Sequence, residues 1–426
     1  MHNTSPADLF ERKDTEILKR SCRFCSGSLG DAFLDLGSMP LANAYLRPEA
    51  LGRSEPSYPL RVFVCPQCFL TQLSDFESRE TLFNDHYAYF SSCSTSWLDH
   101  ASRYVNETVE RFHLNSSHQV IEIASNDGYL LQYFQQKGIA VLGVEPSANV
   151  AQAALQKGIP TVMEFFGVQT ANDLISQGKQ ADLLIGNNVL AHVPDPHDLV
   201  GGIKRILKPT GIVTMEFPHL LRLIENNQFD TIYHEHFSYF TLHAVEQLFK
   251  RHGLTIFDVK SLPTHGGSIR IYAHHAESGF RPTESVKKLK DEENAKGVET
   301  QEFYQKFSND VLSVKKKLLV FLNAARREGK IVAGYGAPAK ANTFFNFCGI
   351  TAEDVAFTVD VSPAKQGYYL PGSRIPIFPP DRIRSLKPDY LLILPWNLRE
   401  EIQTQMAYIR EWGGRFAVAI PRLEVW

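Results

Sequence analysis

The chain has 426 residues, of which 43% are hydrophobic and 21% charged, and its formal net charge is −3. This length exceeds what one hydrophobic core usually serves, so we expect two or three domains. The small net charge argues against a nucleic-acid-binding surface, and no apolar run approaches the ~20 residues that span a membrane. Because residues 1–20 lack the apolar core of a signal peptide, we expect a cytoplasmic protein.

Four of the six cysteines form two C-x2-C pairs, Cys22 with Cys25 and Cys65 with Cys68. In a cytoplasmic protein such pairs are more often metal ligands than disulfides. Two pairs complete a tetrahedral Zn²⁺ site that leaves no open position for water. We therefore predict a structural zinc in a small module over residues 1–80, whose core is too small to be stable without the metal.

Residues 81–116 start with a stretch rich in tyrosine and phenylalanine and continue from Ser96 as an amphipathic helix. From about residue 117 to residue 280, apolar strand segments alternate with helical segments in five successive repeats. This alternation predicts a parallel sheet with helices on both faces. The segment THGGSIRIYAHH predicts a late antiparallel strand in the same unit.

The first strand of this unit leads into the turn Ser125-Asn126-Asp127-Gly128, and the second strand ends in Glu145. In doubly wound sheets a loop and an acid at these places hold a nucleoside and its ribose. The turn lacks the G-x-G-x-x-G pattern of a dinucleotide site, and the acid at 127 would repel a phosphate. We expect Gly128 to let a ligand pass close to the backbone. The turn resembles the first motif of class I S-adenosylmethionine (SAM) methyltransferases, although on this motif alone an acidic turn of another α/β protein stays open.

Polar side chains follow the later strands, where the carboxyl ends of a parallel sheet meet. Asn187, Asn188 and His192 follow one strand, and Glu216 follows the next. The run TIYHEHFSYF comes after them and supplies imidazoles, a carboxylate and phenols suited to acid–base chemistry. Two alternatives remain for this run: a metal site built on H-E-H, and aromatic packing with satisfied imidazoles.

Residues 281–426 predict a second, smaller α/β unit, which begins with a charged amphipathic helical stretch up to Arg327. Beyond it, the turn from Gly334 to Lys340 joins a strand to a helix. Free amides at that helix N-terminus, together with Lys340, suit an anion such as a diphosphate. The alternative is a tight turn with a solvated lysine.

Taken together, these motifs resemble the sugar C-methyltransferases that act on nucleotide-linked keto-deoxysugars. The similarity covers nearly the whole chain in order: the two cysteine pairs, YAYFSS, EIASNDG, GVEPS, GNNVLAHVPD, YHEHFSYF, HGGSIR, GYGAPAKANT and DVSPAKQGYYLPG. The resemblance implies an α/β fold in which a class I Rossmann-like SAM methyltransferase domain is flanked by an N-terminal zinc-binding module and a smaller C-terminal α/β domain that binds the nucleotide sugar.

The resemblance also implies roles for individual residues. His236 matches the proposed general base, Tyr233 and Glu235 lie beside it, and we expect Glu235 to orient it; His192, Tyr87 and Tyr89 match residues that line the sugar site. We expect His234 and His236 to point to opposite sides of an extended loop. The expected SAM-binding residues, with Glu145 on the ribose and Glu164 and Phe165 near the adenine, are Glu122, Ala124, Asn126, Asp127, Gly128, Glu145, Pro146, Glu164, Phe165, Asn187 and Asn188. The expected residues for the sugar nucleotide are His265, Ser268, Arg270, Gly336, Ala337, Lys340 and Asn342.

The expected activity is SAM-dependent C-methylation of a carbon α to the ketone, C3, of a nucleotide-linked 4-keto-deoxyhexose. A base removes the proton while the ketone oxygen is stabilised as an enolate. We expect the sugar nucleotide as partner, neither nucleic acid nor membrane, and a monomer or homodimer. The alternatives are methylation of another acceptor, such as a sugar oxygen or another sugar carbon, and a non-catalytic protein that binds SAM and zinc.

Overall fold

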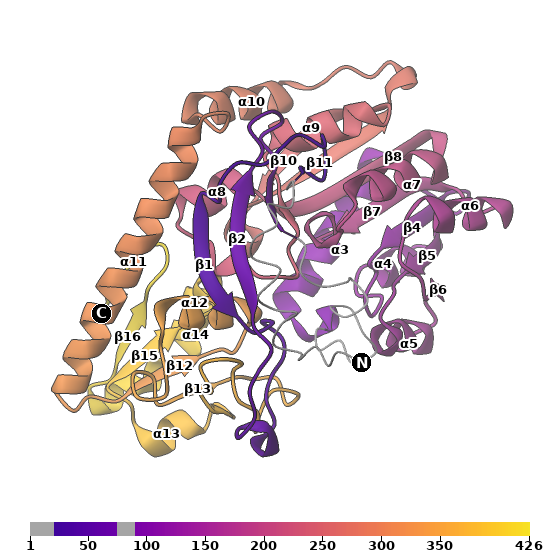
Figure 1. The fold of residues 1–426 in the computed structure, drawn as a ribbon. Coiled ribbons are helices and arrows are strands. Elements are labelled where there is room, and N and C mark those ends of the chain that lie inside the picture. The colour runs from indigo at the N-terminus through magenta and orange to yellow at the C-terminus, as the bar shows by residue number, and fades with distance from the viewer. Residues whose placement is uncertain (1–20, 75–89) are drawn as a thin grey trace, which may run out of the picture.

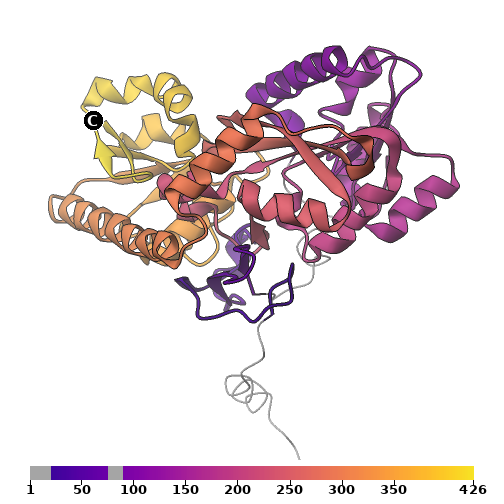
Figure 2. The same cartoon turned by 90° about the horizontal axis from the view of Figure 1, so that it is seen from above.

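The computed structural model describes residues 21–74 and 90–426, which form three sheets with their helices (Figure 1). Seen from above, the central and C-terminal units form two lobes, and the N-terminal sheet lies beneath their junction (Figure 2). In the described part of the chain, none of the helices has both the length and the apolar character to cross a membrane.

The central unit is a seven-stranded sheet with the order β10-β11-β8-β7-β4-β5-β6. All strand pairs of this sheet are parallel except the two pairs of β11, which is antiparallel to both β10 and β8. The predicted parallel sheet and its late antiparallel strand are thus confirmed. The strands are β4 (Gln119–Ile123), β5 (Ala140–Val144), β6 (Thr161–Val162), β7 (Ala181–Asn187), β8 (Leu207–Pro218), β10 (Leu254–Leu262) and β11 (Ser268–His275).

The helices of the central unit pack their apolar sides on this sheet, except α8 (Leu220–Glu225), whose apolar side chains pack in the core shared by the N-terminal sheet and the C-terminal unit. The helix expected from Ser96 begins at Thr95, where the side chain of Ser94 accepts a hydrogen bond from the Trp97 N–H as an N-cap. The helices are α3 (Thr95–Arg111), α4 (Leu131–Gln136), α5 (Ala148–Gln156), α6 (Val168–Ser176), α7 (Pro196–Ile206), α8 (Leu220–Glu225) and α9 (Leu242–Arg251).

The charged helical stretch before the C-terminal sheet is two helices, α10 (Glu284–Lys296) and α11 (Gln301–Arg327), rather than one. Gly297 ends α10 in the left-handed conformation, with φ of 77°. Helix α11 buries one stripe of side chains at helical spacing, which includes Tyr304, Phe307, Val311 and Leu318.

The C-terminal sheet has the order β14-β13-β12-β15-β16-β17, and only β17 is antiparallel. Strand β12 therefore lies between β13 and β15, so the chain crosses to opposite sides of it, as at the switch point of a doubly wound sheet. The strands are β12 (Val332–Tyr335), β13 (Phe357–Val359), β14 (Ile377–Phe378), β15 (Tyr390–Ile393), β16 (Arg415–Val418) and β17 (Glu424–Val425), and the helices are α12 (Ala339–Cys348), α13 (Arg382–Leu386) and α14 (Arg399–Gln405).

The N-terminal sheet is antiparallel and takes its fourth strand from the central unit. Its strands are β1 (Leu34–Met39), β2 (Tyr58–Val64), β3 (Thr71–Leu73) and β9 (Ser238–Tyr239). Strand β9 pairs Tyr239 with Thr71 and Ser238 with Gln72. The end of the YHEHFSYF run is therefore part of the sheet that carries the cysteines, which the sequence did not predict.

Gly128 has a role in the packing of the protein itself. Its φ is +76°, and a Cβ there would lie 2.9 Å from Ile159 Cγ1. The missing side chain thus makes room for Ile159, in addition to the expected close approach of a ligand to this turn.

Replacing Gly128 with alanine should destabilise the protein more than the same change at Gly138. Both have positive φ, but a Cβ at exposed Gly138 would have no atom within 4 Å. Both changes cost about 1–2 kcal/mol of left-handed strain, and overpacking against Ile159 adds about 1–3 kcal/mol at 128. Denaturant unfolding of the two variants measures the difference, and equal losses would contradict the packing role.

Candidate active site and metal centre

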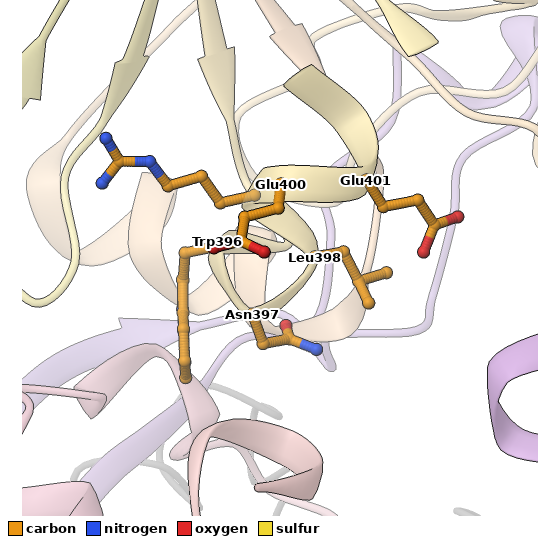
Figure 3. Close-up of a pocket in the computed structure, with 6 residues that line it drawn as sticks. Trp396, Asn397, Leu398, Glu400 and Glu401 are labelled. Carbon is orange, nitrogen blue, oxygen red and sulfur yellow. The ribbon is translucent and has the colours of Figure 1, made fainter. Parts of the chain in front are cut away.

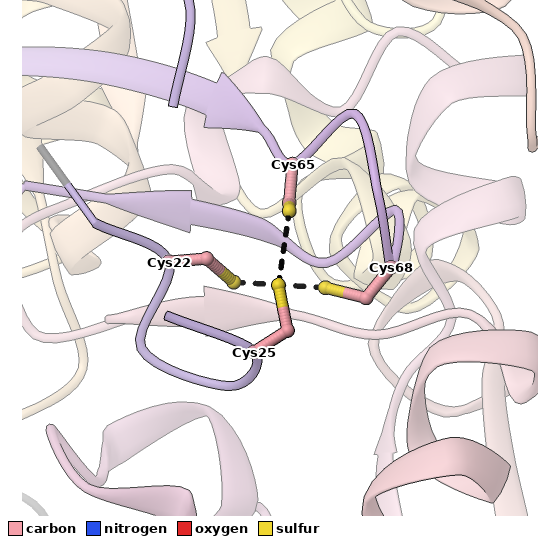
Figure 4. Close-up of side chains that lie close together, drawn as sticks. All are labelled: Cys22, Cys25, Cys65 and Cys68. Carbon is pink, nitrogen blue, oxygen red and sulfur yellow. Dashed lines mark hydrogen bonds between the residues drawn. The ribbon is translucent and has the colours of Figure 1, made fainter. Parts of the chain in front are cut away.

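The four paired cysteines meet at one point of the N-terminal sheet (Figure 4). Their sulfur atoms all lie within 4.8 Å of one another, with Cys22 Sγ 3.6 Å from Cys68 Sγ and Cys25 Sγ 3.4 Å from Cys65 Sγ. Thiolates at ~2.3 Å from one Zn²⁺ lie about 3.8 Å apart in a tetrahedron. The donor set and its spacing therefore fit a closed, structural zinc.

N–H groups surround this sulfur cluster. The Gln72 side chain donates to Cys22 Sγ at 3.2 Å, the Phe24 N–H donates to the same sulfur at 3.4 Å, and the Gln67 N–H donates to Cys65 Sγ at 3.5 Å. Such donors stabilise and orient thiolate ligands of a metal.

The loop after β4 and the acid after β5 are joined by hydrogen bonds. Glu145 accepts the Asn126 N–H at 3.0 Å with one oxygen and the Ser147 N–H at 2.9 Å with the other. Burial raises the pKa of Glu145, and these two amides oppose the rise. A carboxylate oxygen accepts more than one hydrogen bond, so Glu145 retains capacity for ribose hydroxyls.

Several buried polar atoms around this loop have no hydrogen-bond partner among the described residues. They belong to the ends of β4 and β7 and are Ser125 Oγ, Asp127 Oδ1, Asn187 Oδ1 and Asn188 Oδ1. Buried polar groups in native proteins are nearly always paired, so their grouping fits a polar ligand at the carboxyl edge of the sheet. The residues present are thus suited to hold SAM.

Other expected SAM residues have protein partners or different surroundings. The Asn126 side chain accepts the Ser91 N–H at 2.9 Å, and Asp127 pairs with Lys157 at 3.1 Å. Glu122 is fully buried, which raises its pKa well above the ordinary value. Ala124, Pro146 and Phe165 are half-buried, and Glu164 is exposed.

His236 has its ring fixed by the backbone of its own loop. Its Nδ1–H donates to the Thr231 carbonyl at 2.8 Å, which leaves Nε2 as the nitrogen without a proton. Burial lowers the pKa of His236 well below its ordinary value, so the imidazole is neutral near pH 7. The residue is only half-buried, so it is a neutral acceptor that a substrate can reach.

Aromatic side chains and a second histidine surround His236. Its ring centroid lies 4.0 Å from that of Tyr233, 4.6 Å from that of His192 and 6.0 Å from that of Tyr239. His192 donates from Nδ1 to the Glu235 carbonyl at 2.9 Å, and burial lowers its pKa to about 4. Both histidines therefore have the proton on Nδ1 and an acceptor at Nε2.

The expectation that Glu235 orients His236 is wrong. The Glu235 carboxylate accepts the Asn43 side-chain N–H at 2.6 Å, on the side of the N-terminal sheet. Burial raises the pKa of Glu235 to about 7. Its contribution to the histidines is the backbone carbonyl that holds His192, while Thr231 orients His236.

His234 and His236 do contact different sides, as expected, although the loop is not extended. The His236 N–H donates to the Tyr233 carbonyl at 2.9 Å, which forms a turn. His234 bonds from Nε2 to the Tyr58 carbonyl at 3.2 Å and is buried on the N-terminal sheet. The other two expected residues of the sugar site, Tyr87 and Tyr89, lie outside the residues that the structure describes.

Lys340 lies where the C-terminal sheet meets the central unit. Its Nζ bonds to the Asn397 side chain and lies 4.3 Å from the centroid of the Trp396 ring, whose Nε1–H donates to Asp230 at 2.7 Å. Burial lowers the pKa of Lys340 to about 8, and the charge of Asp230 opposes that shift. The cation therefore lies between the two units.

The loop with His265 joins the SAM side of the site to this lysine. His265 Nε2 lies 3.2 Å from Asn188 Nδ2. A Cβ at Gly266 would lie 2.3 Å from the Trp396 ring, so glycine lets the two loops meet. His265 and Lys340 thus lie on the same side of the molecule as the carboxyl end of β7.

Trp396 also forms one wall of a hollow of about 440 Å³ on the C-terminal unit, with Asn397, Leu398, Arg399, Glu400 and Glu401. In Figure 3 the Trp396 side chain extends down toward the ribbon of the central unit, whereas Glu401 extends to the right, away from Trp396. Arg399 is paired with Glu424 at 2.6 Å. Among the residues that line the hollow, Trp396 and Asn397 contact Lys340.

Five expected sugar-nucleotide residues make contacts within the protein, through hydrogen bonds or through the space beside them, although Arg270 Nε and Asn342 Oδ1 have no hydrogen-bond partner among the described residues. Arg270 is 1% exposed and pairs with Glu216 at 2.5 Å, beside His100. The Ser268 hydroxyl donates to the Thr264 carbonyl at 3.0 Å, and the Asn342 side chain donates to the Ala42 carbonyl at 2.5 Å.

The Gly334–Lys340 turn likewise does not offer all the free amides that the sequence predicted for binding an anion. The Ala337 N–H donates to Asp360 at 2.7 Å, and the Ala337 carbonyl accepts from Tyr45 and Lys365. A Cβ at Gly336 would lie 2.6 Å from Pro395. Of this turn, Lys340 alone keeps the expected character of a cation at the site.

The sequence reasoning missed His100, Thr264, Asn43 and Asp230. His100 and Thr264 bond to the two oxygens of Glu216, and Asn43 holds Glu235. A signal for the buried Glu216–Arg270 pair was available, because opposite charges stand in two apolar strands of the same unit. The partners from helix α3 and from the N-terminal module carried no such signal.

Comparison with known proteins places the chain in a family. Family models match a zinc binding domain at residues 22–83, a methyltransferase domain at 97–259 and the C-methyltransferase C-terminal domain at 263–421. The C-methyltransferase NovU of Streptomyces niveus is 37% identical over 407 residues, which cover 95% of this chain and 96% of that protein. The chain belongs to this C-methyltransferase family.

As a member of the C-methyltransferase family, the chain is an enzyme that uses SAM, and the non-catalytic alternative is wrong. The four-cysteine cluster lies inside the matched zinc binding domain. A ubiquinone biosynthesis O-methyltransferase of Pasteurella multocida is 28% identical over 108 residues, 22% of this chain and 44% of that protein. The magnesium protoporphyrin IX methyltransferase ChlM of Synechocystis, solved with bound SAM, is 15% identical with a TM-score of 0.33 over 46% of this chain and 88% of that chain.

The variant Cys65→Ser should lose zinc and unfold more easily, because three thiolates and a hydroxyl bind Zn²⁺ less tightly. Elemental analysis and thermal unfolding measure both effects. The matched control is Cys93→Ser, an exposed cysteine outside the cluster, which should keep the metal. A Cys65→Ser protein that is metal-free, fully folded and fully active would contradict a structural zinc.

The variant Glu145→Ala should weaken SAM binding by about 10- to 100-fold, because a charge-assisted hydrogen bond contributes roughly 1.5–3 kcal/mol. Binding of the sugar nucleotide should change less. Glu145→Gln keeps one acceptor oxygen, so its SAM affinity should lie between those of the wild type and of Glu145→Ala. Calorimetry that finds SAM affinity unchanged in Glu145→Ala would show that Glu145 does not hold the cofactor.

Proposed function

We propose that this C-methyltransferase methylates C3, the carbon beside the ketone, of a nucleotide-linked 4-keto-deoxyhexose. The observation that carries the proposal is the state of His236: a neutral ring whose single proton is held on Nδ1 by the Thr231 carbonyl. A carbon acid beside a ketone needs such an acceptor within reach. Methylation of an oxygen does not pass through an enolate and so needs no base that removes a proton from carbon.

His236 Nε2 removes the proton from the carbon, and the positive charge then develops on the imidazole. His192 cannot donate to the ketone oxygen while neutral, because its single proton is bonded to the Glu235 carbonyl. The donor to the developing enolate oxygen is therefore the Tyr233 hydroxyl, whose ring lies 4.0 Å from that of His236.

SAM, when bound over Ala124–Gly128 and Glu145, supplies the methyl group. The protein positions the acceptor carbon beside it, and such positioning provides much of the rate. Asn187 and Asn188 have unpaired side-chain oxygens on this side of the site and are suited to orient the cofactor. His265 bonds to Asn188 and so lies where cofactor and sugar meet.

The diphosphate of the sugar nucleotide binds Lys340. A lowered pKa does not prevent this role, because a bound anion favours the charged ammonium. The Ala337 amide is taken by Asp360, so the lysine rather than the turn carries the charge recognition. The nucleotide then lies against the C-terminal unit, and the sugar points to His236.

Replacing His236 with alanine should abolish both methylation and solvent-deuterium exchange at the reacting carbon, while SAM and the sugar nucleotide still bind. Exchange measured without SAM reports proton removal alone. The control His118→Ala removes a half-buried histidine whose Nδ1 accepts the Asn115 N–H, away from the His236 loop, and should keep both activities.

The pH profile provides a second readout. Because burial lowers the pKa of His236, the base is neutral and active above a pKa that lies below the ordinary ~6.5 of histidine. Activity lost only at that lower pH is the expected result. Exchange at the wild-type rate in His236→Ala would show that another group, such as His192, takes the proton.

A further inference from the structure

The zinc site and the two histidine loops are connected through one side chain, Arg23. It lies in the first C-x2-C pair, between Cys22 and Cys25. Its Nη1 donates to the Pro194 carbonyl at 2.9 Å, and its Nη2 donates to the Leu73 carbonyl at 2.7 Å. Pro194 follows His192 by two residues, so one arm of the guanidinium holds the His192 loop.

The other arm reaches the loop of His236. The Leu73 N–H donates to the Phe237 carbonyl at 3.0 Å, and the guanidinium carbon lies 5.4 Å from the centroid of the Phe237 ring. Phe237 directly follows His236. Its own N–H donates to the Ala191 carbonyl at 2.7 Å, next to His192. Arg23 therefore contacts the point where the two histidine loops meet.

A second connection runs from the zinc ligand itself. Gln72 donates from its side chain to Cys22 Sγ at 3.2 Å and accepts the Arg23 N–H at 3.0 Å. In the sheet, Gln72 is the partner of Ser238, two residues beyond His236. One hydrogen-bonded network thus sets the positions of the Cys22 thiolate, of Arg23 and of the His236 loop.

We propose that Arg23 is a positioning residue of the methyl-transfer reaction, which holds His192 and His236 in register through the zinc-bound knuckle. The inference rests on the proposed role of His236 as base. Arginine has a planar fork that donates to two carbonyls in a fixed geometry, whereas lysine presents its donors from one nitrogen on a flexible stem. A base displaced by about 1 Å loses roughly 100-fold in rate, so the effect should fall on kcat.

Two variants, Arg23→Met and Arg23→Lys, test this role in the full-length enzyme with zinc bound. We expect kcat to fall about 10- to 100-fold in Arg23→Met and by less in Arg23→Lys, with the KM for SAM and for the sugar nucleotide within about threefold of wild type. Deuterium exchange at the reacting carbon should slow by the same factor as kcat. Added guanidinium ion should restore part of the exchange rate in Arg23→Met.

The matched control is Arg61→Met, which removes an exposed arginine paired with Asp35 in the same small sheet. It should leave kcat, both KM values and zinc content unchanged. If either Arg23 variant keeps zinc and wild-type kcat, the proposal is overturned. If both variants lose zinc and thermal stability together with activity, Arg23 serves folding alone and the proposal is also overturned.

A different result would show that His236 is not the base. In that case His236→Ala would keep deuterium exchange, and the Arg23 proposal would be overturned together with the base assignment. If His236→Ala loses exchange while Arg23→Lys retains the wild-type exchange rate, the base stands and only the positioning role of Arg23 is wrong.

Discussion

Two residue pairs, Thr71 with Tyr239 and Gln72 with Ser238, join the N-terminal sheet to the loop of His236. Strand β9 has only two residues, too few to be stable without a sheet to pair with. The strand that it pairs with, β3, follows directly after the second cysteine pair. The geometry of the loop that carries the proposed base thus depends on the sheet that bears the four cysteines. If His236 is the base, the structural zinc contributes to its position through this sheet.

The buried pair of Glu216 and Arg270 has a related function on the other side of the site. Burial alone would raise the pKa of Glu216, but the hydrogen bond from His100 and the charge of Arg270 hold it at about 2. Such a pair is weak evidence for stability, because desolvation offsets much of the attraction. Its geometric effect is firm: it ties β8 to β11, and through Thr264 it fixes the loop that carries His265.

Elements with a strong local pattern were predictable from the sequence. The strand–turn–helix around Asn126, Glu145 after the second strand and the four cysteines all follow rules of spacing that hold within a few tens of residues. Helix α10 ends at Gly297, which a glycine in a charged helical stretch could have indicated. The central sheet could therefore be predicted from the sequence.

Contacts between units were not predictable, because they depend on which segments meet in space. Glu235 was expected beside His236, since they are neighbours in the sequence, but its carboxylate bonds to Asn43, nearly two hundred positions away. Arg270 and Asn342 have the polar groups that a phosphate or sugar would need, yet their partners are Glu216 and Ala42. Residue type alone does not distinguish a ligand-binding group from one that a distant segment satisfies.

In the central and the C-terminal sheet, the loop after the first strand is held by the same kind of hydrogen bonding. In the central unit Glu145 accepts the Asn126 and Ser147 amides, and in the C-terminal unit Asp360 accepts the Ala337 and Ser362 amides. Each acid follows the second strand and fixes the turn after the first. The central turn leaves buried polar atoms unpaired, whereas the Ala337 carbonyl is bonded by Tyr45 and Lys365. The same local architecture therefore leaves polar atoms available for a ligand, which we propose is SAM, in the central unit. In the C-terminal unit it is bonded to Tyr45 of the zinc-binding module.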